Sequence, residues 1–163
     1  MLPIAFGVLL IATPFQHAPV RLAPRPCDVG AAKDIGAVQH VLSKRLVNIF
    51  RRARGKAWQQ DPTLNRLVDP NAEFDLGAGD VGRPMGGGTT GARNISIAMP
   101  ASSFRYTSWM SIPMPADACA EQQVTVDFFD PATGDVARVE GIFRGGILLS
   151  AKGWMQAEVS GKL

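Results

Sequence analysis

The sequence predicts a single-domain protein of the α+β class, with a long N-terminal helix, shorter helices and an antiparallel sheet. Two patterns and the chain length support this prediction. Apolar residues recur every three or four positions between residues 33 and 58, and they alternate with polar ones from residue 122 onward. The 163 residues are enough for one domain, and 46% hydrophobic with 19% charged residues is typical of globular proteins and excludes a disordered chain.

The first 23 residues form a hydrophobic leader, or signal peptide, that continues into a Pro-rich linker. Residues 2–15 carry no charge, and these 14 residues are fewer than the ~20 that a helix needs to cross a bilayer. A secretory signal is therefore favoured. An uncleaved anchor and a misplaced start codon stay open, because no Lys or Arg precedes the run. We expect a periplasmic or secreted protein with one α+β domain at residues 31–160 and no stable membrane span after processing.

The sequence has two cysteines, Cys27 and Cys119, and both follow the leader. In an oxidising compartment such a pair usually forms a disulfide. In the chain-entropy model, closing a loop of this length contributes about 4–5 kcal/mol. Two separate buried thiols are the alternative.

The apolar stripe between residues 33 and 58 predicts a long amphipathic helix whose opposite face is strongly basic. This charge allows two interpretations. The first is a solvated face whose cations lie toward the helix C-terminus, where the helix dipole favours them. The second is an adaptor surface for an anionic partner. The stripe consists of Ile35, Val38, Leu42, Leu46, Ile49 and Ala53, and the basic face of Lys44, Arg45, Arg51, Arg52, Arg54 and Lys56.

The middle of the chain combines short elements with turn signals. Asp61 and Pro62 predict the start of a short helix that ends before residues 69–70, and residues 73–76 alternate like a strand. A Gly-rich loop is expected over residues 77–88. A helix then starts at Thr89 or Thr90 and stops before Pro100, and a strand is predicted over residues 104–112.

From residue 122 the sequence predicts a meander of three antiparallel strands. Gly145 and Gly146 form a two-residue hairpin signal, which places Phe143 opposite Leu148 and Gly141 opposite Ser150. The turn DPATGD places Asp127 opposite Arg138. Alternation then gives a core face and a mixed face, and a partner subunit in a homodimer is expected to cover the mixed one. The expected core face collects Val124, Val126, Phe128, Ala137, Val139, Phe143, Leu148 and Trp154, with Ser150 and Lys152 as polar members.

This order of elements resembles the nuclear-transport-factor-two-like superfamily, which includes ketosteroid isomerase and polyketide-cyclase-like proteins. The resemblance is carried by the long first helix, the segment LVDPNAEFDL, the Gly-rich segment with its helix, and the closing strands VTVDFF, VEGIF and LLSAKGW. It implies a curved antiparallel sheet that wraps the helices into a cone-like fold with an apolar pocket, often in a dimer packed sheet against sheet. Members of this superfamily differ in activity, so the resemblance transfers no reaction.

An apolar pocket is expected inside the cone, because the stripe of the first helix is too narrow to cover the whole core face of the sheet. Its expected ligand is a small apolar molecule. The residues expected to line it are Phe74, Tyr106, Met110 and Trp154.

An isomerase or dehydratase is the alternative function, with Asp75 or Lys152 acting beside Tyr106. These side chains also have plainer interpretations. Glu73 and Asp75 share a strand face and suit two solvated carboxylates, while Lys152 suits a side chain that extends its amine past the sheet edge into water.

The sequence lacks the motifs of several common functions. Gly77, Gly79 and Gly82 match G-x-G-x-x-G, but no helix follows directly and no acidic residue stands where a ribose needs one, which excludes a dinucleotide site. The sequence has no P-loop, no G-x-S-x-G and no metal-ligand spacing, so neither a metal nor a cofactor is expected. A net charge of +3 does not indicate nucleic acid as a partner. The glycines before residue 89, with Arg83 and Arg93 nearby, form either an anion site or a flexible connection.

Overall fold

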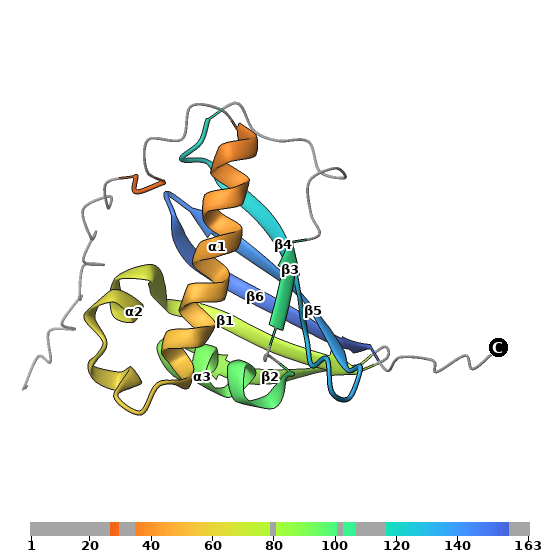
Figure 1. The fold of residues 1–163 in the computed structure, drawn as a ribbon. Coiled ribbons are helices and arrows are strands. Elements are labelled where there is room, and N and C mark those ends of the chain that lie inside the picture. Colours follow the sequence, from red (N-terminus) through yellow and green to blue (C-terminus); the bar gives the residue numbers. More distant parts are fainter. Residues whose placement is uncertain (1–26, 30–34, 79–80, 101–102, 107–116, 157–163) are drawn as a thin grey trace, which may run out of the picture.

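The computed structural model describes residues 27–29, 35–78, 81–100, 103–106 and 117–156, and it confirms the α+β class (Figure 1). The strands form one six-stranded sheet in the order β2-β1-β6-β5-β4-β3. α1 lies across one face of this sheet, with α3 near its C-terminal end (Figure 1). The elements are α1 (Ile35–Arg54), the short 3-10 helix η1 (Trp58–Gln60), α2 (Pro62–Leu67), β1 (Val68–Ala78), β2 (Val81–Gly87), α3 (Gly88–Ala98), β3 (Ser103–Tyr106), β4 (Glu121–Phe129), β5 (Val136–Arg144) and β6 (Ile147–Gln156).

The sheet is mixed rather than wholly antiparallel, which corrects one part of the predicted fold. β4, β5 and β6 form the expected antiparallel meander, and β2 and β3 add antiparallel edges. β1 runs parallel to β6 and pairs Phe74 with Ala151 and Asp75 with Lys152. A short hairpin turn forces strands to be antiparallel. No such turn joins β1 to β6, because most of the domain lies between them in the sequence.

α2 begins at its predicted cap, whereas α3 begins at Gly88, directly after Gly87 and without the predicted threonine cap. The Asp61 carboxylate accepts hydrogen bonds from the backbone N–H groups of Thr63 (2.9 Å) and Leu64 (3.1 Å), and Pro62 occupies the first turn of α2. α3 begins at Gly88 and ends at Ala98, close to the predicted bounds. None of the helices in the described ranges is long and apolar enough to span a bilayer.

The Gly-rich segment is an edge strand and not the predicted loop. β2 pairs with β1 from Val81 to Gly87, and a register shift in this ladder leaves Met85 as a β-bulge. Gly, Pro and a bulge are all features of edge strands, where they limit pairing with other chains. These residues have low strand propensity, so the sequence did not predict a strand here. The strand forms because β2 pairs with β1.

Most of the predicted meander register is confirmed. Asp127 lies opposite Arg138, and the two side chains form an ion pair with a separation of 2.8 Å between Arg138 Nε and Asp127 Oδ1. Phe143 lies opposite Leu148, as the Gly145-Gly146 turn requires.

The register changes one residue later, and this corrects the predicted core face of β6. Ile142 pairs with Ser150, so Leu149 is bulged and Gly141 lies opposite Ala151 instead of Ser150. One extra residue turns every later side chain to the other face of the sheet. As a result Ala151 is buried, whereas Lys152 and Trp154 are exposed on the outer face.

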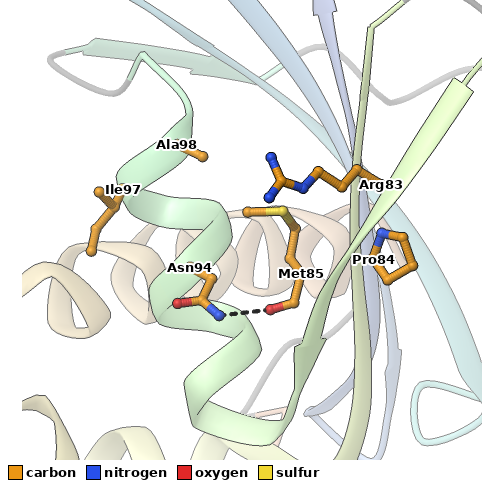
Figure 2. A pocket seen from close by; sticks show the side chains of 6 residues that line it. All are labelled: Arg83, Pro84, Met85, Asn94, Ile97 and Ala98. Carbon is orange, nitrogen blue, oxygen red and sulfur yellow. Dashed lines mark hydrogen bonds between the residues drawn. The ribbon is translucent and has the colours of Figure 1, made fainter.

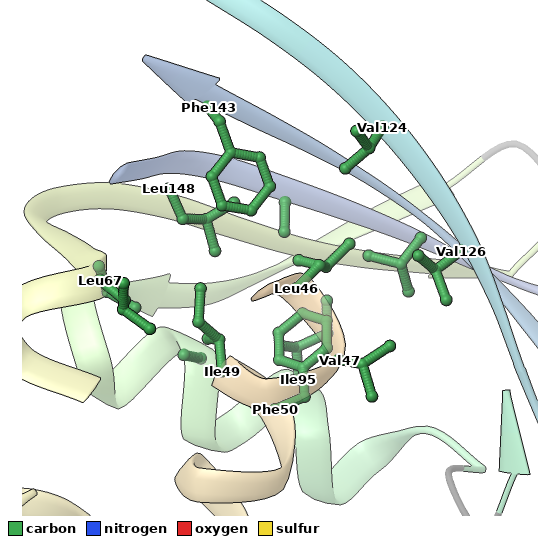
Figure 3. Packing of buried hydrophobic residues seen from close by; sticks show 14 of the residues in the cluster. Leu46, Val47, Ile49, Phe50, Leu67, Ile95, Val124, Val126, Phe143 and Leu148 are labelled. Atoms are coloured by element: carbon green, nitrogen blue, oxygen red, sulfur yellow. The ribbon is translucent and has the colours of Figure 1, made fainter. Parts of the chain in front are cut away.

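The hydrophobic core lies between the concave face of the curved sheet and the helices (Figure 3). α1 contributes buried residues from successive turns between Val38 and Ala53, and Phe50 packs edge-on against Phe128 of β4 with ring centroids 5.5 Å apart. Leu46 approaches β5 at Gly141, where a Cβ atom would lie 3.2 Å from the Leu46 methyl groups. The largest fully buried apolar side chains are Phe50, Phe74, Phe143, Leu42, Leu46, Ile49, Leu64, Ile95, Leu148, Val38 and Val68.

The predicted disulfide is confirmed. Cys27 and Cys119 are bonded, with their Cα atoms 5.6 Å apart and a sequence separation of 92. The segment after Cys27 is fixed to the β5–β6 turn, since the Asp28 N–H donates to the Gly145 carbonyl at 3.0 Å and Arg45 donates to the Asp28 and Gly146 carbonyls. The disulfide therefore attaches the segment at residues 27–29 to one end of the sheet.

Candidate functional site

Of the four residues expected to line an interior pocket, the two whose side chains the structure describes lie on opposite faces of the sheet. Phe74 is buried in the core, 1% exposed, and Trp154 is 37% exposed on the outer face. Tyr106 pairs with Val126 at the far edge of the sheet, but its side chain and all of Met110 lie outside the described residues. The bulge at Leu149 is the physical reason why Trp154 faces outward.

A groove lies between β2 and α3 and is lined by described residues of both elements (Figure 2). It is open to solvent and has a volume of about 290 Å³. This volume lies at the lower end of the ~300–1,000 Å³ that is usual for ligand pockets, so the groove suits a small molecule. Its lining residues are Arg83, Pro84, Met85, Asn94, Ile97 and Ala98.

The walls of the groove are held together at the β2 bulge. Met85 has no partner on β1, and its carbonyl instead accepts a hydrogen bond from Asn94 Nδ2 of α3 at 2.8 Å (Figure 2). This bond satisfies the backbone group that the bulge leaves unpaired.

Glycines allow α3 to approach the hairpin closely. A Cβ atom on Gly91 would lie 2.4 Å from the Gly86 carbonyl oxygen and 2.5 Å from the Phe74 ring. Gly88 has a φ of +56° and lies against Pro70, where a Cβ atom would be 2.9 Å from the carbonyl oxygen. The glycines of this segment therefore serve close packing between α3 and the β1–β2 hairpin.

Polar and apolar surface contribute about equally to the groove, and its lining has a single charged side chain. Met85, Ile97 and Ala98 supply apolar surface, and Ile97 is 57% exposed. Arg83 is the charged residue of the lining, and no acidic side chain belongs to it. The sequence suggested an anion site at the α3 N-terminus with Arg93 as one of its cations. Arg93 instead donates to the Ala53 carbonyl of α1 at 2.7 Å.

The candidate acid–base residues lie apart or face water. Asp75 and Lys152 are cross-strand neighbours, and Glu140 lies on the other side of Lys152. Asp75 alternates with the core-facing Phe74, so this row lies on the outer face of the sheet. Tyr106 stands on β3, with β4, β5 and β6 between it and β1. The strand positions thus separate Tyr106 from both of its predicted partners.

Arginines of the basic face of α1 contact other elements of the same protein. Arg52 forms an ion pair with Asp61 at 2.8 Å, and the Arg51 guanidinium lies 5.0 Å from the centre of the Phe104 ring. The Arg52 hydrogen bond, followed by the Leu64 N–H, lowers the pKa of Asp61. These contacts favour a structural role over the adaptor interpretation.

Two arginines cap the ends of neighbouring helices reciprocally, which the sequence did not reveal. Arg54 of α1 donates to the carbonyls of Ser96 and Met99 at the end of α3, while Arg93 of α3 donates to the Ala53 carbonyl at the end of α1. Cations at helix C-termini are favourable because the last carbonyls lack partners. Burial, followed by the charge of Arg93, lowers the pKa of Arg54.

Metal-ligating side chains are not grouped: within the described ranges, no three His, Cys, Asp or Glu residues lie close enough to hold an ion.

No protein-family model matches the sequence, and no curated protein is similar to it at a significant level. Solved structures give partial likenesses. One is a nuclear-transport-factor-two-like protein of unknown function from Methylobacillus flagellatus, with 12% identity and a TM-score of 0.45 over 71% of this chain and 90% of that one. Another, from Cytophaga hutchinsonii, has 12% identity and a TM-score of 0.41 over 72% and 89%. A de novo designed protein with a curved β-sheet has 11% identity and a TM-score of 0.41 over 73% and 88%.

The order of helices and strands confirms the expected resemblance in fold, with the six-stranded curved sheet wrapped around the helices. Fold alone transfers no activity to this chain.

Proposed function

We propose that this protein is an exported binding protein that holds a small, largely apolar molecule in the groove between β2 and α3. The observation that carries the proposal is the groove itself, an open hollow of about 290 Å³ with Met85, Ile97 and Ala98 on its walls. Ile97 is 57% exposed although it is a large apolar residue, and a bound molecule would remove part of that surface from water.

The disulfide supports export. A Cys27–Cys119 bond persists in an oxidising compartment, and the uncharged leader of residues 2–15 precedes it. An isomerase or dehydratase is the weaker candidate, because Asp75 and Lys152 belong to the solvent-facing side of the sheet.

Binding of 1-octanol, a neutral apolar probe, tests the proposed function by NMR titration of the mature protein. Ile97→Asp places a charge on the apolar wall and should weaken binding at least tenfold. Trp154→Gln is the matched control, because it removes exposed apolar surface from the opposite face and should leave the affinity unchanged. Equal loss in both variants, or no binding by the unmodified protein, would contradict the proposal.

We also propose that the outer sheet face pairs with a second copy of the chain. Trp154 lies exposed on this face, beside a row in which Lys152 stands between Glu140 and Asp75. A face with an apolar centre and alternating charges can be complementary to itself when two copies meet around a two-fold axis.

A further inference from the structure

Resting on the proposed function, we infer that the groove selects amphipathic anions, with Arg83 binding the head group and the α3 side of the groove binding the apolar chain. The ligand class is a small molecule with a carboxylate at one end and a short aliphatic chain. Arg83 would then be the residue that determines specificity.

Arg83 is the one arginine of the described residues that has no partner. Every other described arginine forms an ion pair, donates to a backbone carbonyl or lies over an aromatic ring; these are Arg45, Arg51, Arg52, Arg54, Arg66, Arg93, Arg105, Arg138 and Arg144. The arginine side chains that the structure describes are thus nearly always engaged. The guanidinium that is not engaged is the one that borders the groove.

No carboxylate of the groove lining competes for this guanidinium. Asp75 is the acidic residue of the neighbouring strand that lies nearest in the register, but it lies opposite Pro84, whereas Arg83 lies opposite Leu76. Successive residues of a strand point to opposite faces, so Asp75 and Arg83 lie on opposite faces of the hairpin. An anionic ligand would therefore meet a free guanidinium and no carboxylate among the lining residues.

Apolar surface continues from Arg83 in both directions. Arg83 extends from β2 across the groove, above Met85 and toward α3 (Figure 2). Ala98 lies on the side of α3 that faces Arg83, and Ile97 also belongs to the groove lining (Figure 2). Val81, which is 74% exposed, stands two residues before Arg83 on the same side of β2. A head group on the guanidinium would leave an aliphatic chain along these residues.

The chemistry of the two ends suits this ligand class. A guanidinium presents two parallel N–H groups that match the two oxygens of a carboxylate, and such bidentate pairs are stronger than neutral hydrogen bonds. The aliphatic chain gains from leaving water, and the groove volume restricts it to a short chain.

Octanoate and 1-octanol provide the test, because they share one chain length and differ in the head group. We expect the unmodified protein to bind octanoate about tenfold more tightly than octanol at pH 8 in low salt, which corresponds to about 1.4 kcal/mol. Arg83→Gln should abolish this preference and leave octanol binding unchanged, and Arg83→Lys should retain part of it. Arg144→Gln, which removes an equal charge from an exposed arginine outside the groove, should behave like the unmodified protein.

The outcomes separate this inference from the proposed function. Equal affinities of the unmodified protein for the two probes would overturn the role of Arg83 and leave the apolar groove as a binding site. A preference for octanoate that survives in Arg83→Gln would also overturn it. Binding of neither probe would contradict the proposed function and the inference together.

Discussion

Replacement of Gly91 by alanine tests whether the glycines around the hairpin serve close packing. On an exposed helix this change would stabilise the protein by about 1 kcal/mol, because alanine has the higher helix propensity. Here the new Cβ atom would lie 2.4 Å from the Gly86 carbonyl oxygen and 2.5 Å from the Phe74 ring. Backbone cannot move aside as a flexible side chain can, so the overpacking cost should be near the upper end of the usual ~1–3 kcal/mol.

The net effect of Gly91→Ala should therefore be a loss of about 2 kcal/mol in the free energy of unfolding. For a chain of this length that corresponds to a fall of roughly 4–8 °C in Tm. Urea unfolding followed by tryptophan fluorescence measures it. Gly82→Ala is the control, since a Cβ atom there meets nothing within 4 Å and alanine should be neutral or slightly stabilising. A Gly91→Ala protein as stable as the unmodified one would refute the packing argument.

Three further predictions concern the disulfide, the α2 cap and the outer face. Replacing both Cys27 and Cys119 by alanine should lower the free energy of unfolding by about 2–5 kcal/mol, and thiol titration of the denatured mature protein should find no free thiol; two free thiols would contradict the bond. Asp61→Asn should destabilise the protein at pH 7, because the lowered pKa of Asp61 contributes stability there. The difference in free energy of unfolding between the variant and the unmodified protein should shrink as the pH falls from about 4 through that lowered pKa. Destabilisation that does not depend on pH would contradict this prediction. Trp154→Glu should convert a dimer to a monomer in sedimentation velocity, and a monomeric unmodified protein would argue against pairing through this face.

Local patterns were enough to predict the long helix, the α2 cap and the disulfide. The stripe of α1 and the Asp61-Pro62 start depend on residues a few positions apart, so neighbouring sequence determines them. The same holds for the pairing of Asp127 with Arg138, because a short turn sets that register.

The features that could not be predicted depend on contacts between distant segments. Nothing in the sequence around Leu148 and Leu149 signals a bulge, and the presence of that bulge decides whether Trp154 faces the core or water. β2 has poor strand propensity and forms because β1 pairs with it. Arg54 and Arg93 cap each other's helices, and each bonds to a carbonyl 40 or more positions away in the sequence. No local sequence pattern predicts such a pair.

The position of the ligand on the protein tests the central claim most directly. Backbone amide shifts should be mapped by NMR while octanoate is added to the mature, disulfide-bonded protein. The account predicts that the largest shifts fall on Arg83, Met85, Asn94, Ile97 and Ala98, the groove residues that carry an amide N–H. Largest shifts around Trp154 on the outer face, or among the core residues beneath α1, would contradict it.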